Sequence, residues 1–392
     1  MINLKKLDKK RNIKTNQLFL MADLFAGCGG LSTGLEQAGF TPWFVNEIVE
    51  TFADTYKLNH PTVPPENIFV EDINVLNKSL HQNDALCNGK ITLVCGGPPC
   101  QGFSMANRQR IIDDPRNQLY KAYLFFLQQV RPKFFIMENV RGMAKKYEEI
   151  KENFKEYLGD EYEFDFRLFY AQDFGVPQNR ERFIMIGNRV GVSINDIFDK
   201  IDSYRRSPFV LRDALYGLPH LSAKKEKGKQ NVENADSGFT KQNFIYPRTP
   251  FYTFINGEKD ITVLYNHKNR YNNERDIEIF KRLPQGANSL HKSIEDIMPY
   301  SRRNSIFKDK YFKLDENCIC KTITSHMRFD CNMYIHPWEA RGLSPREAAR
   351  IQTFPDDYVF SGPLGAWYTQ IGNAVPVKLA EAIGRGIMEF LK

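Results

Sequence analysis

Apolar runs and amphipathic stretches alternate along the first 140 residues of the chain. The apolar runs predict buried strands at residues 18–25, 40–47, 91–97 and 133–140. The amphipathic stretches predict helices at residues 31–39, 48–60 and 117–130. Strands that alternate with helices are typical of a parallel α/β sheet, in which ligands bind at the carboxyl ends of the strands.

The regular alternation stops after about residue 190, and clear helical patterns return only at residues 343–354 and 375–392. Much of the sequence between is polar and weakly periodic, as in exposed loops. We therefore predict an α/β domain made of residues 1–190 and 364–392. A smaller, irregular domain at residues 191–363 is inserted before the C-terminal helix.

Composition and charge narrow the classes of function. Of the 392 residues, 42% are hydrophobic, which is enough for a large core. The net charge is +7, and the excess lies at residues 200–350, which hold 27 Lys and Arg and 18 Asp and Glu, against 27 and 29 in the rest of the chain. A basic block suits a polyanionic partner such as nucleic acid, and it equally suits a lysine-rich soluble surface.

The cysteines and the hydropathy pattern indicate the cellular compartment of the protein. The seven cysteines have no regular spacing, which argues against a disulfide framework and fits a reducing cytosol. Cys318, Cys320, His326 and Cys331 lack the spacing of common zinc sites, so we predict no metal. No apolar run reaches the roughly 18 residues of a membrane span, and the basic N-terminus lacks the apolar stretch of a secretory signal. These features predict a cytoplasmic protein.

A glycine-rich turn, FAGCGG at residues 25–30, lies between the first predicted strand and helix. Glycines allow a tight turn and a close approach of the backbone to a ligand. Glu47 ends the next strand, where an acid can accept hydrogen bonds from ribose hydroxyls. This pair suits a nicotinamide dehydrogenase as well as a methyltransferase, and it also fits a plain strand–turn–helix connection.

Other strand ends carry reactive or charged side chains. The turn GGPPCQGFS at residues 96–104 presents Cys100 after two prolines that fix the backbone, as suits a positioned nucleophile. Glu138 ends another strand, where a carboxyl group can act as a general acid or hold a ring nitrogen. Arg180 and Arg182 alternate before an apolar segment and can bind a carbonyl oxygen or a phosphate. Taken singly, each of these charged residues equally fits a surface salt bridge.

Together these segments resemble the DNA (cytosine-5)-methyltransferase family, of the bacterial restriction-modification type. The matching segments, in the family's order, are DLFAGCGG, GGPPCQGFS, ENV, QNRERFIMIG, REAARIQTFPD and QIGNAVP. The resemblance covers roughly residues 20–190 and 320–392. Ile48 departs from it, because many members have an aromatic residue there that packs on adenine. The resemblance implies a Rossmann-like, S-adenosylmethionine-dependent methyltransferase sheet, with a target-recognition domain inserted before the C-terminal helix.

The resemblance also implies catalytic roles for four residues. Cys100 would add as a thiolate to carbon 6 of cytosine, which makes carbon 5 nucleophilic toward a methyl sulfonium. Glu138 would bind ring nitrogen 3 and the exocyclic amine, and Arg182 the carbonyl oxygen. Arg180 would position the catalytic loop and nearby backbone. A duplex base must leave the stack to reach the thiol, so base flipping is implied.

The implied cofactor is S-adenosyl-L-methionine, with Glu47 on its ribose. The implied cofactor-binding residues are Phe25, Gly27, Gly30, Glu47, Asp72, Ile73, Pro99, Leu119, Asn373 and Ala374. The loop at residues 104–117 would close over DNA, and its Arg108 and Arg110 suit phosphate contacts. Taken alone, this segment equally fits an ordinary polar loop. Candidates for contacts to phosphates or guanine edges are Arg270, Arg302, Arg303 and Arg328. Arg346 and Glu347 would be structural.

The implied partners are double-stranded DNA and a cognate restriction endonuclease acting on the same site, with the methyltransferase acting as a monomer. A tRNA cytosine-5 methyltransferase is one alternative, and the long basic block argues against it. An inactive DNA-binding relative is another, and the intact Cys100, Glu138 and Arg182 argue against that.

Overall fold

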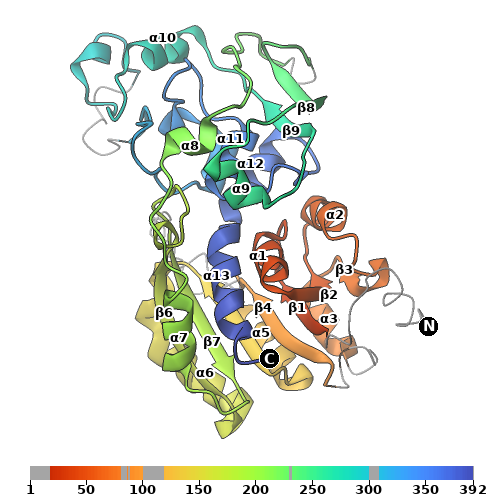
Figure 1. Cartoon of the computed structure of the whole chain (residues 1–392). Coiled ribbons are helices and arrows are strands. Elements are labelled where there is room, and N and C mark those ends of the chain that lie inside the picture. Colours follow the sequence, from red (N-terminus) through yellow and green to blue (C-terminus); the bar gives the residue numbers. More distant parts are fainter. Residues whose placement is uncertain are drawn as a thin grey trace.

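A seven-stranded sheet forms the centre of the first domain, in the order β3-β2-β1-β4-β5-β7-β6 (Figure 1). The computed structural model describes residues 18–80, 86, 89–99, 119–228, 232–299 and 309–391. Within these residues the strands are β1 (Phe19–Leu24), β2 (Phe40–Asn46), β3 (Ile68–Phe69), β4 (Ile91–Gly96), β5 (Phe134–Asn139), β6 (Glu163–Tyr170) and β7 (Glu181–Asn188). Strands β1 to β5 pair in parallel, as their helical crossovers require.

The last two strands of the sheet run the other way. β7 pairs antiparallel with both β5 and β6. The connection from Tyr170 to Glu181 contains only one short 3-10 helix, too little chain for the crossover that parallel strands need. The parallel sheet expected from the first 140 residues is therefore confirmed, and β7 and β6 extend it in the antiparallel direction.

Helices cover both faces of this sheet (Figure 1). One face is covered by α1 (Gly30–Ala38), α7 (Ile194–Asp202) and α13 (Val377–Met388). The other is covered by α3 (Ile73–Ser79), α5 (Leu119–Val130) and α6 (Tyr147–Leu158), while α2 (Glu50–Asn59) follows β2 near the sheet edge. All of the helices predicted in the first 140 residues are present, with ends that shift by a few residues.

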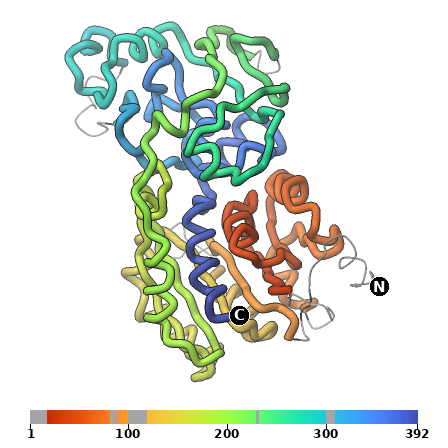
Figure 2. The backbone as a smooth tube through the Cα atoms, viewed as in Figure 1, coloured from red at the N-terminus to blue at the C-terminus, as the bar shows by residue number. Residues whose placement is uncertain are grey.

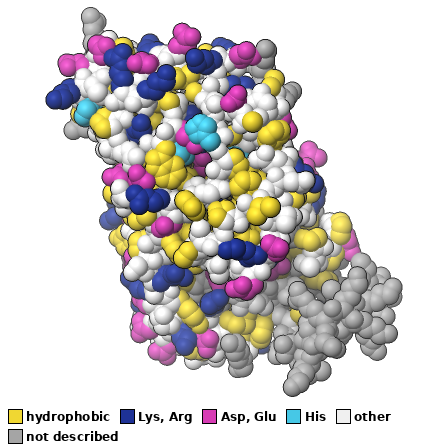
Figure 3. Space-filling view, turned by 45° about the horizontal axis from the view of Figure 1, so that its top comes forward, with side chains coloured by type: hydrophobic (Ala, Val, Ile, Leu, Met, Phe, Trp, Pro, Cys, Tyr) yellow, Lys and Arg dark blue, Asp and Glu magenta, His cyan; other side chains and the backbone are white. Residues whose placement is uncertain are grey.

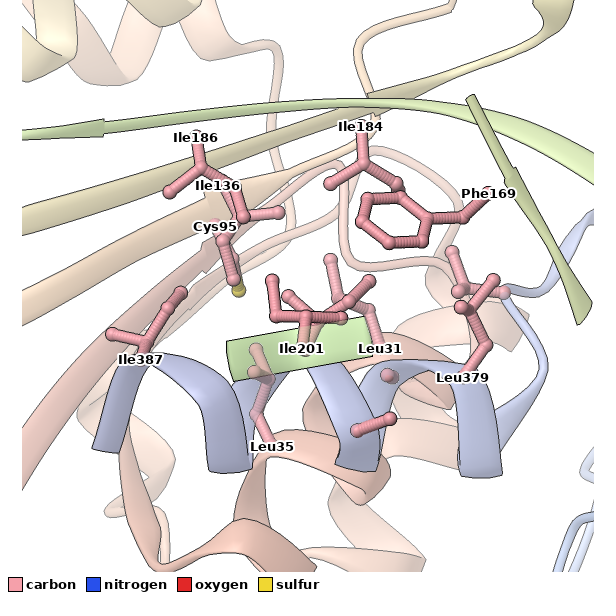
Figure 4. Packing of buried hydrophobic residues seen from close by; sticks show 14 of the residues in the cluster. Leu31, Leu35, Cys95, Ile136, Phe169, Ile184, Ile186, Ile201, Leu379 and Ile387 are labelled. Atoms are coloured by element: carbon pink, nitrogen blue, oxygen red, sulfur yellow. The ribbon is translucent and has the colours of Figure 1, made fainter. Parts of the chain in front are cut away.

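The C-terminal helix is part of the sheet domain's core. Side chains of α1, α7 and α13 meet the strands in Figure 4, where the labelled residues are Leu31, Leu35, Cys95, Ile136, Phe169, Ile184, Ile186, Ile201, Leu379 and Ile387. Gly34 lets α1 and α13 approach closely, because a Cβ there would lie 2.3 Å from the carbonyl oxygen of Val377. The last helix therefore returns to the first domain, as Figure 2 shows.

The second domain is small and irregular. Its two-stranded sheet pairs β8 (Gly238–Asn243) with β9 (Val263–Lys268), antiparallel. Its helices are α8 (Leu211–Leu215), α9 (Pro250–Asn256), α10 (Glu274–Arg282), α11 (Pro345–Ile351) and α12 (Leu364–Asn373). In the described part of the chain, no helix is long and apolar enough to cross a membrane.

Buried charges fix helix α11 at the centre of this domain. Glu347 accepts a hydrogen bond from the backbone N–H of Ser344 and pairs with Arg341 at 2.7 Å. Arg346 donates to the carbonyl oxygens of Tyr265 at 2.8 Å and Pro355 at 3.1 Å. Each charge therefore has hydrogen-bonded partners, as buried charges require. The contacts support the structural roles expected of Arg346 and Glu347.

The two hydrophobic cores do not divide the chain at the expected positions. Helix α7 lies beyond residue 190, yet Ile197 and Ile201 pack in the core of the sheet domain. Helix α12 begins at Leu364, yet Trp367 and Ile371 pack in the core of the second domain. Packing thus places α7 with the first domain and α12 with the second.

Candidate active site

A cavity of about 410 Å³ opens where the carboxyl ends of β1, β2, β4 and β5 meet the segment that joins α12 to α13. Of the residues expected from sequence, it is lined by Phe25, Gly27, Gly30, Glu47, Pro99, Glu138, Arg180, Arg182, Asn373 and Ala374. Segments separated by more than 300 residues thus form one site, as expected for ligands at strand ends.

The glycine-rich turn and Glu47 are tied together by hydrogen bonds. Phe25 and Gly27 both have positive φ, at 56° and 57°, and a Cβ on Gly27 would meet nothing within 4 Å. Glu47 accepts hydrogen bonds from the backbone N–H groups of Gly27 and Val49, each at 2.8 Å. Burial raises the pKa of Glu47, and these donors oppose that rise. The carboxylate is therefore fixed in orientation at the wall of the cavity.

Glu138 and Arg182 form an ion pair across neighbouring strands. Glu138 is in β5 and Arg182 in β7, and Arg182 Nε lies 2.7 Å from Glu138 Oε1. The two side chains are only 13% and 11% exposed, so little solvent screens the pair. Burial lowers the pKa of Arg182, and Glu138 raises it. A planar base entering here would meet a carboxyl group and a guanidinium side by side.

The turn after β4 lies directly over this pair. A Cβ on Gly97 would be 2.8 Å from Glu138 Oε2, so a larger residue there would displace the carboxyl group from its present position. Asn139 Nδ2 donates to the carbonyl oxygen of Pro98 at 2.9 Å, which ties the turn to the end of β5. The described chain reaches Pro99. Cys100 and residues 104–117 lie outside the described residues, and their predicted roles stay predictions.

Arg180 is buried between the sheet and the second domain. It is 1% exposed and donates to the carbonyl oxygens of Ile323 (2.5 Å), Gly372 (3.0 Å) and Ala374 (2.9 Å). It immediately precedes β7 and connects the start of that strand to two segments that are more than 140 residues away in sequence. These contacts are to backbone, in line with the positioning role expected of Arg180.

Three expected cofactor residues do not line the cavity. Asp72 caps helix α3 by accepting a hydrogen bond from Asn74 N–H at 2.7 Å. Ile73 is 2% exposed in the core beneath α3, and Leu119 packs against the same core at the start of α5. Their predicted contacts with the cofactor stay predictions, because none of the three residues lines this cavity.

The cavity also contains residues that sequence reasoning missed. Phe52, one turn into α2, lines it together with Ile48, which is 62% exposed. Gln370 lines it too, and its Oε1 is buried without a hydrogen-bond partner among the described residues. The spacing could have identified Phe52. It follows Ile48 by four positions in the predicted helix at residues 48–60, and such side chains share one helix face.

Most of the arginines expected to contact DNA have other roles or lie outside the described residues. Arg270 donates to the carbonyl oxygens of Met327 and Phe329, each at 2.6 Å, so it is held within the second domain. Arg328 lies over the ring of exposed Phe329, at 4.3 Å. Arg302 and Arg303 are outside the described residues. On the face in Figure 3, Lys and Arg side chains are interspersed with Asp and Glu, so charge alone does not outline a DNA path there.

Asp23, at the base of the cavity, predicts a pH dependence of stability. It is 2% exposed, accepts a hydrogen bond from Ser32 Oγ at 2.6 Å, and has its pKa raised by burial from the usual 3.8 to about 7. The folded protein thus holds a proton that the unfolded chain has lost above pH 4, so unfolding free energy falls as pH rises toward 7. An asparagine side chain does not titrate, so Asp23→Asn avoids this loss. The difference in unfolding free energy between the variant and the wild type should therefore shift by about 3 kcal/mol in favour of the variant from pH 5 to pH 8. Urea unfolding at both pH values measures this, and a gain that does not change with pH would contradict it.

Comparison with solved structures shows which class of protein has this fold. The fold resembles that of a prophage-encoded DNA modification methyltransferase of E. coli, with a TM-score of 0.72, 26% identity, and coverage of 95% of this chain and 99% of that one. The fold is therefore that of α/β DNA methyltransferases.

The sequence comparisons define the family. A family model for C-5 cytosine-specific DNA methylases matches residues 19–389. The Type II methyltransferase M.DdeI of Desulfomicrobium norvegicum is 31% identical over 391 residues, covering 94% of this chain and 88% of the relative. The Type II methyltransferase M1.HphI of Haemophilus parahaemolyticus is 31% identical over 384 residues, covering 94% and 86%. The chain belongs to the C-5 cytosine-specific DNA methylases and is a DNA cytosine-5 methyltransferase.

Proposed function

We propose that the methyl donor is S-adenosyl-L-methionine and that it binds in the cavity at the strand ends. The cavity's volume of about 410 Å³ is in the range of small-molecule sites. Glu47 offers a fixed carboxylate for ribose hydroxyls, and Gln370 Oε1 offers an acceptor without a partner in the described chain. Phe52 supplies an aromatic ring beside Ile48, where the family's usual aromatic is absent. When bound, the cofactor supplies an electrophilic methyl group on sulfur.

Cys100 is the proposed nucleophile, acting on a cytosine flipped out of the duplex. The thiolate adds to carbon 6, and carbon 5 takes the methyl group as its bond to the sulfonium sulfur breaks, which leaves S-adenosyl-L-homocysteine. Carbon 5 then loses its proton, and Cys100 leaves by elimination. Glu138 holds ring nitrogen 3 and the exocyclic amine, and Arg182 holds the carbonyl oxygen. The observation that carries this proposal is the Glu138–Arg182 pair, directly beneath the turn that leads to Cys100.

The second domain is the proposed target-recognition domain, reading a specific sequence in double-stranded DNA. Its content of basic residues suits phosphate contacts. The relatives above are named Type II methyltransferases. We therefore place the enzyme in a restriction-modification system of the cytoplasm, beside a cognate endonuclease, acting as a monomer.

Expression in a methylation-deficient bacterium tests the whole proposal. We expect 5-methylcytosine at one short DNA motif with the wild type and none with Cys100→Ser, because serine is far less nucleophilic toward carbon 6. Bisulfite sequencing at single-base resolution provides the measurement. Cys318→Ser, which changes an exposed cysteine of the second domain, is the matched control and should methylate normally.

Two results would contradict the proposal. Full methylation by Cys100→Ser would remove Cys100 from the nucleophile's role. Absence of methylation with soluble wild-type protein would direct attention to tRNA as substrate or to DNA binding without catalysis. Titration of purified protein with S-adenosyl-L-homocysteine tests the cofactor independently of the DNA sequence.

A further inference from the structure

A second cavity, of about 550 Å³, lies between the two domains. It is lined by Gln37 of α1, by four residues of α13, and by residues 253–257 of the second domain's α9 region. No residue lines both this cavity and the cofactor cavity. It is therefore a separate site, and nothing in the proposed methyl transfer uses it.

The cavity faces away from the sheet. Leu379, Ile383 and Ile387 of α13 pack inward on the strands. Lys378 and Arg385, on the other side of the same helix, line the cavity. The helical period places these two sets on opposite faces.

Positive charge predominates in the lining. Its cations are Arg206, Lys259, Lys378 and Arg385, and its carboxylate is Glu381. Glu381 is shared: Lys378 Nζ lies 2.7 Å from it, and Arg385 also pairs with it. Lys259 pairs with Asp357 at 2.8 Å. The lining thus keeps a net positive charge after its ion pairs are counted.

Arg206 has no carboxylate partner within the part of the chain that the structure describes. Its guanidinium lies 4.4 Å from the ring centre of Phe254 and 5.3 Å from that of Phe209, which holds the group by cation–π contact. Lys378 approaches the same Phe254 ring at 5.3 Å. Two cations thus lie around one ring. The Arg206 guanidinium has no carboxylate partner among the described residues, whereas Lys378 Nζ already donates to Gln37 Oε1 at 2.9 Å and to Glu381 at 2.7 Å.

We propose that this cavity binds a small polyanion of the phosphate class, with two adjacent anionic groups, as in pyrophosphate or a nucleoside diphosphate. One anionic group would meet Arg206, whose planar fork suits a phosphate. The other would meet Lys378 and Arg385 in competition with Glu381, with which both now pair. The volume lies in the range of small-molecule sites, whereas a DNA duplex needs a groove rather than a pocket. Because the lining comes from both domains, such a ligand bridges them.

The local electrostatics agree with this assignment. Burial lowers the pKa of Lys378, and the nearby charges of Arg385 and Arg206 lower it further, against the effect of Glu381. An anion between these cations relieves their repulsion. Binding should accordingly weaken as salt concentration rises.

Calorimetric titration of the purified full-length protein with inorganic pyrophosphate, in low-salt buffer free of phosphate and sulfate, tests the proposal. We expect saturable one-to-one binding, and at least tenfold weaker binding by Arg206→Gln, since the variant loses a charge-assisted contact to the ligand. Arg385→Gln should weaken binding similarly. The control Arg205→Gln changes the neighbouring arginine, which pairs with Asp173 and Asp202 outside the cavity, and should bind normally.

The proposal fails if the wild type shows no saturable binding, or if Arg206→Gln and Arg205→Gln bind pyrophosphate equally. Weaker duplex binding by Arg206→Gln, with no pyrophosphate binding by the wild type, would also overturn it and assign Arg206 to the DNA backbone. Matching unfolding temperatures of the variants and the wild type without ligand exclude misfolding as the cause. The measurement needs no methylation, so its outcome is independent of the proposed function.

Discussion

Glu138→Gln should slow methyl transfer at least a hundredfold while cofactor affinity changes less than threefold. The amide keeps the shape of the side chain and an oxygen that faces Arg182, 2.7 Å away in the wild type. It loses the charge and the exchangeable proton with which a carboxyl group stabilises an addition to the cytosine ring. General acid and electrostatic contributions of this kind are worth about 10²–10⁴ in rate. Single-turnover methylation of duplex DNA gives the rate, and titration with S-adenosyl-L-homocysteine gives the affinity.

The matched control for this variant is Glu181→Gln. Glu181 is adjacent to Arg182 in β7 and pairs with Arg141 at 3.1 Å, and it does not line the cofactor cavity. Its rate should stay within threefold of the wild type. A Glu138→Gln rate that is equally close to the wild type would show that the carboxyl group takes no part in the reaction. A large loss of cofactor affinity would instead indicate a distorted cavity.

The sequence predicted the part of the site that depends on strand ends. Gly27, Glu47 and Glu138 each follow or end a short apolar run, and parallel strands bring such ends to one edge of a sheet. The same logic places the turn at Gly97 beside them. Local sequence patterns were therefore enough to predict those site residues that the sheet topology brings together.

Other features depend on long-range packing that no local pattern encodes. Arg270 is an arginine in the basic block, as a DNA contact would be, yet its guanidinium donates to the backbone carbonyl oxygens of Met327 and Phe329. The antiparallel direction of β7 follows from a short connection, which an apolar run does not reveal. Helix α7 lies beyond the change in pattern near residue 190, but its apolar face still packs on the sheet.

The second cavity illustrates the same limit. Arg206 and Lys378 are 172 positions apart in the chain, and each alone has the pattern of an ordinary surface cation. Only the return of α13 to the sheet brings both to the ring of Phe254. Chemistry that needs two domains is therefore visible in the structure and not in the sequence.

Arg180→Lys should destabilise the protein by about 2–3 kcal/mol and loosen the contact between the two domains. One guanidinium now donates to three buried carbonyl oxygens, those of Ile323, Gly372 and Ala374. An ammonium group on a shorter, flexible chain cannot reach all three in this geometry. The carbonyl oxygen of Ala374 keeps a second donor, Gln352 Nε2 at 3.2 Å, but each buried acceptor left unpaired costs about 1–3 kcal/mol. Thermal unfolding measures the loss, and hydrogen exchange should quicken at residues 320–326 and 372–376.

A matched arginine separates this effect from a general cost of removing guanidinium groups. Arg189 also donates to backbone carbonyl oxygens, those of Arg131 at 3.0 Å and Pro132 at 3.1 Å, but from an exposed position within the sheet domain. Arg189→Lys should therefore cost less than about 1 kcal/mol, because water replaces any lost partner. Equal losses in the two variants, or unchanged exchange at residues 372–376 in Arg180→Lys, would refute the positioning role. A selective loss would mean that Arg180 holds the domains, and with them the wall of the cofactor cavity, in one arrangement.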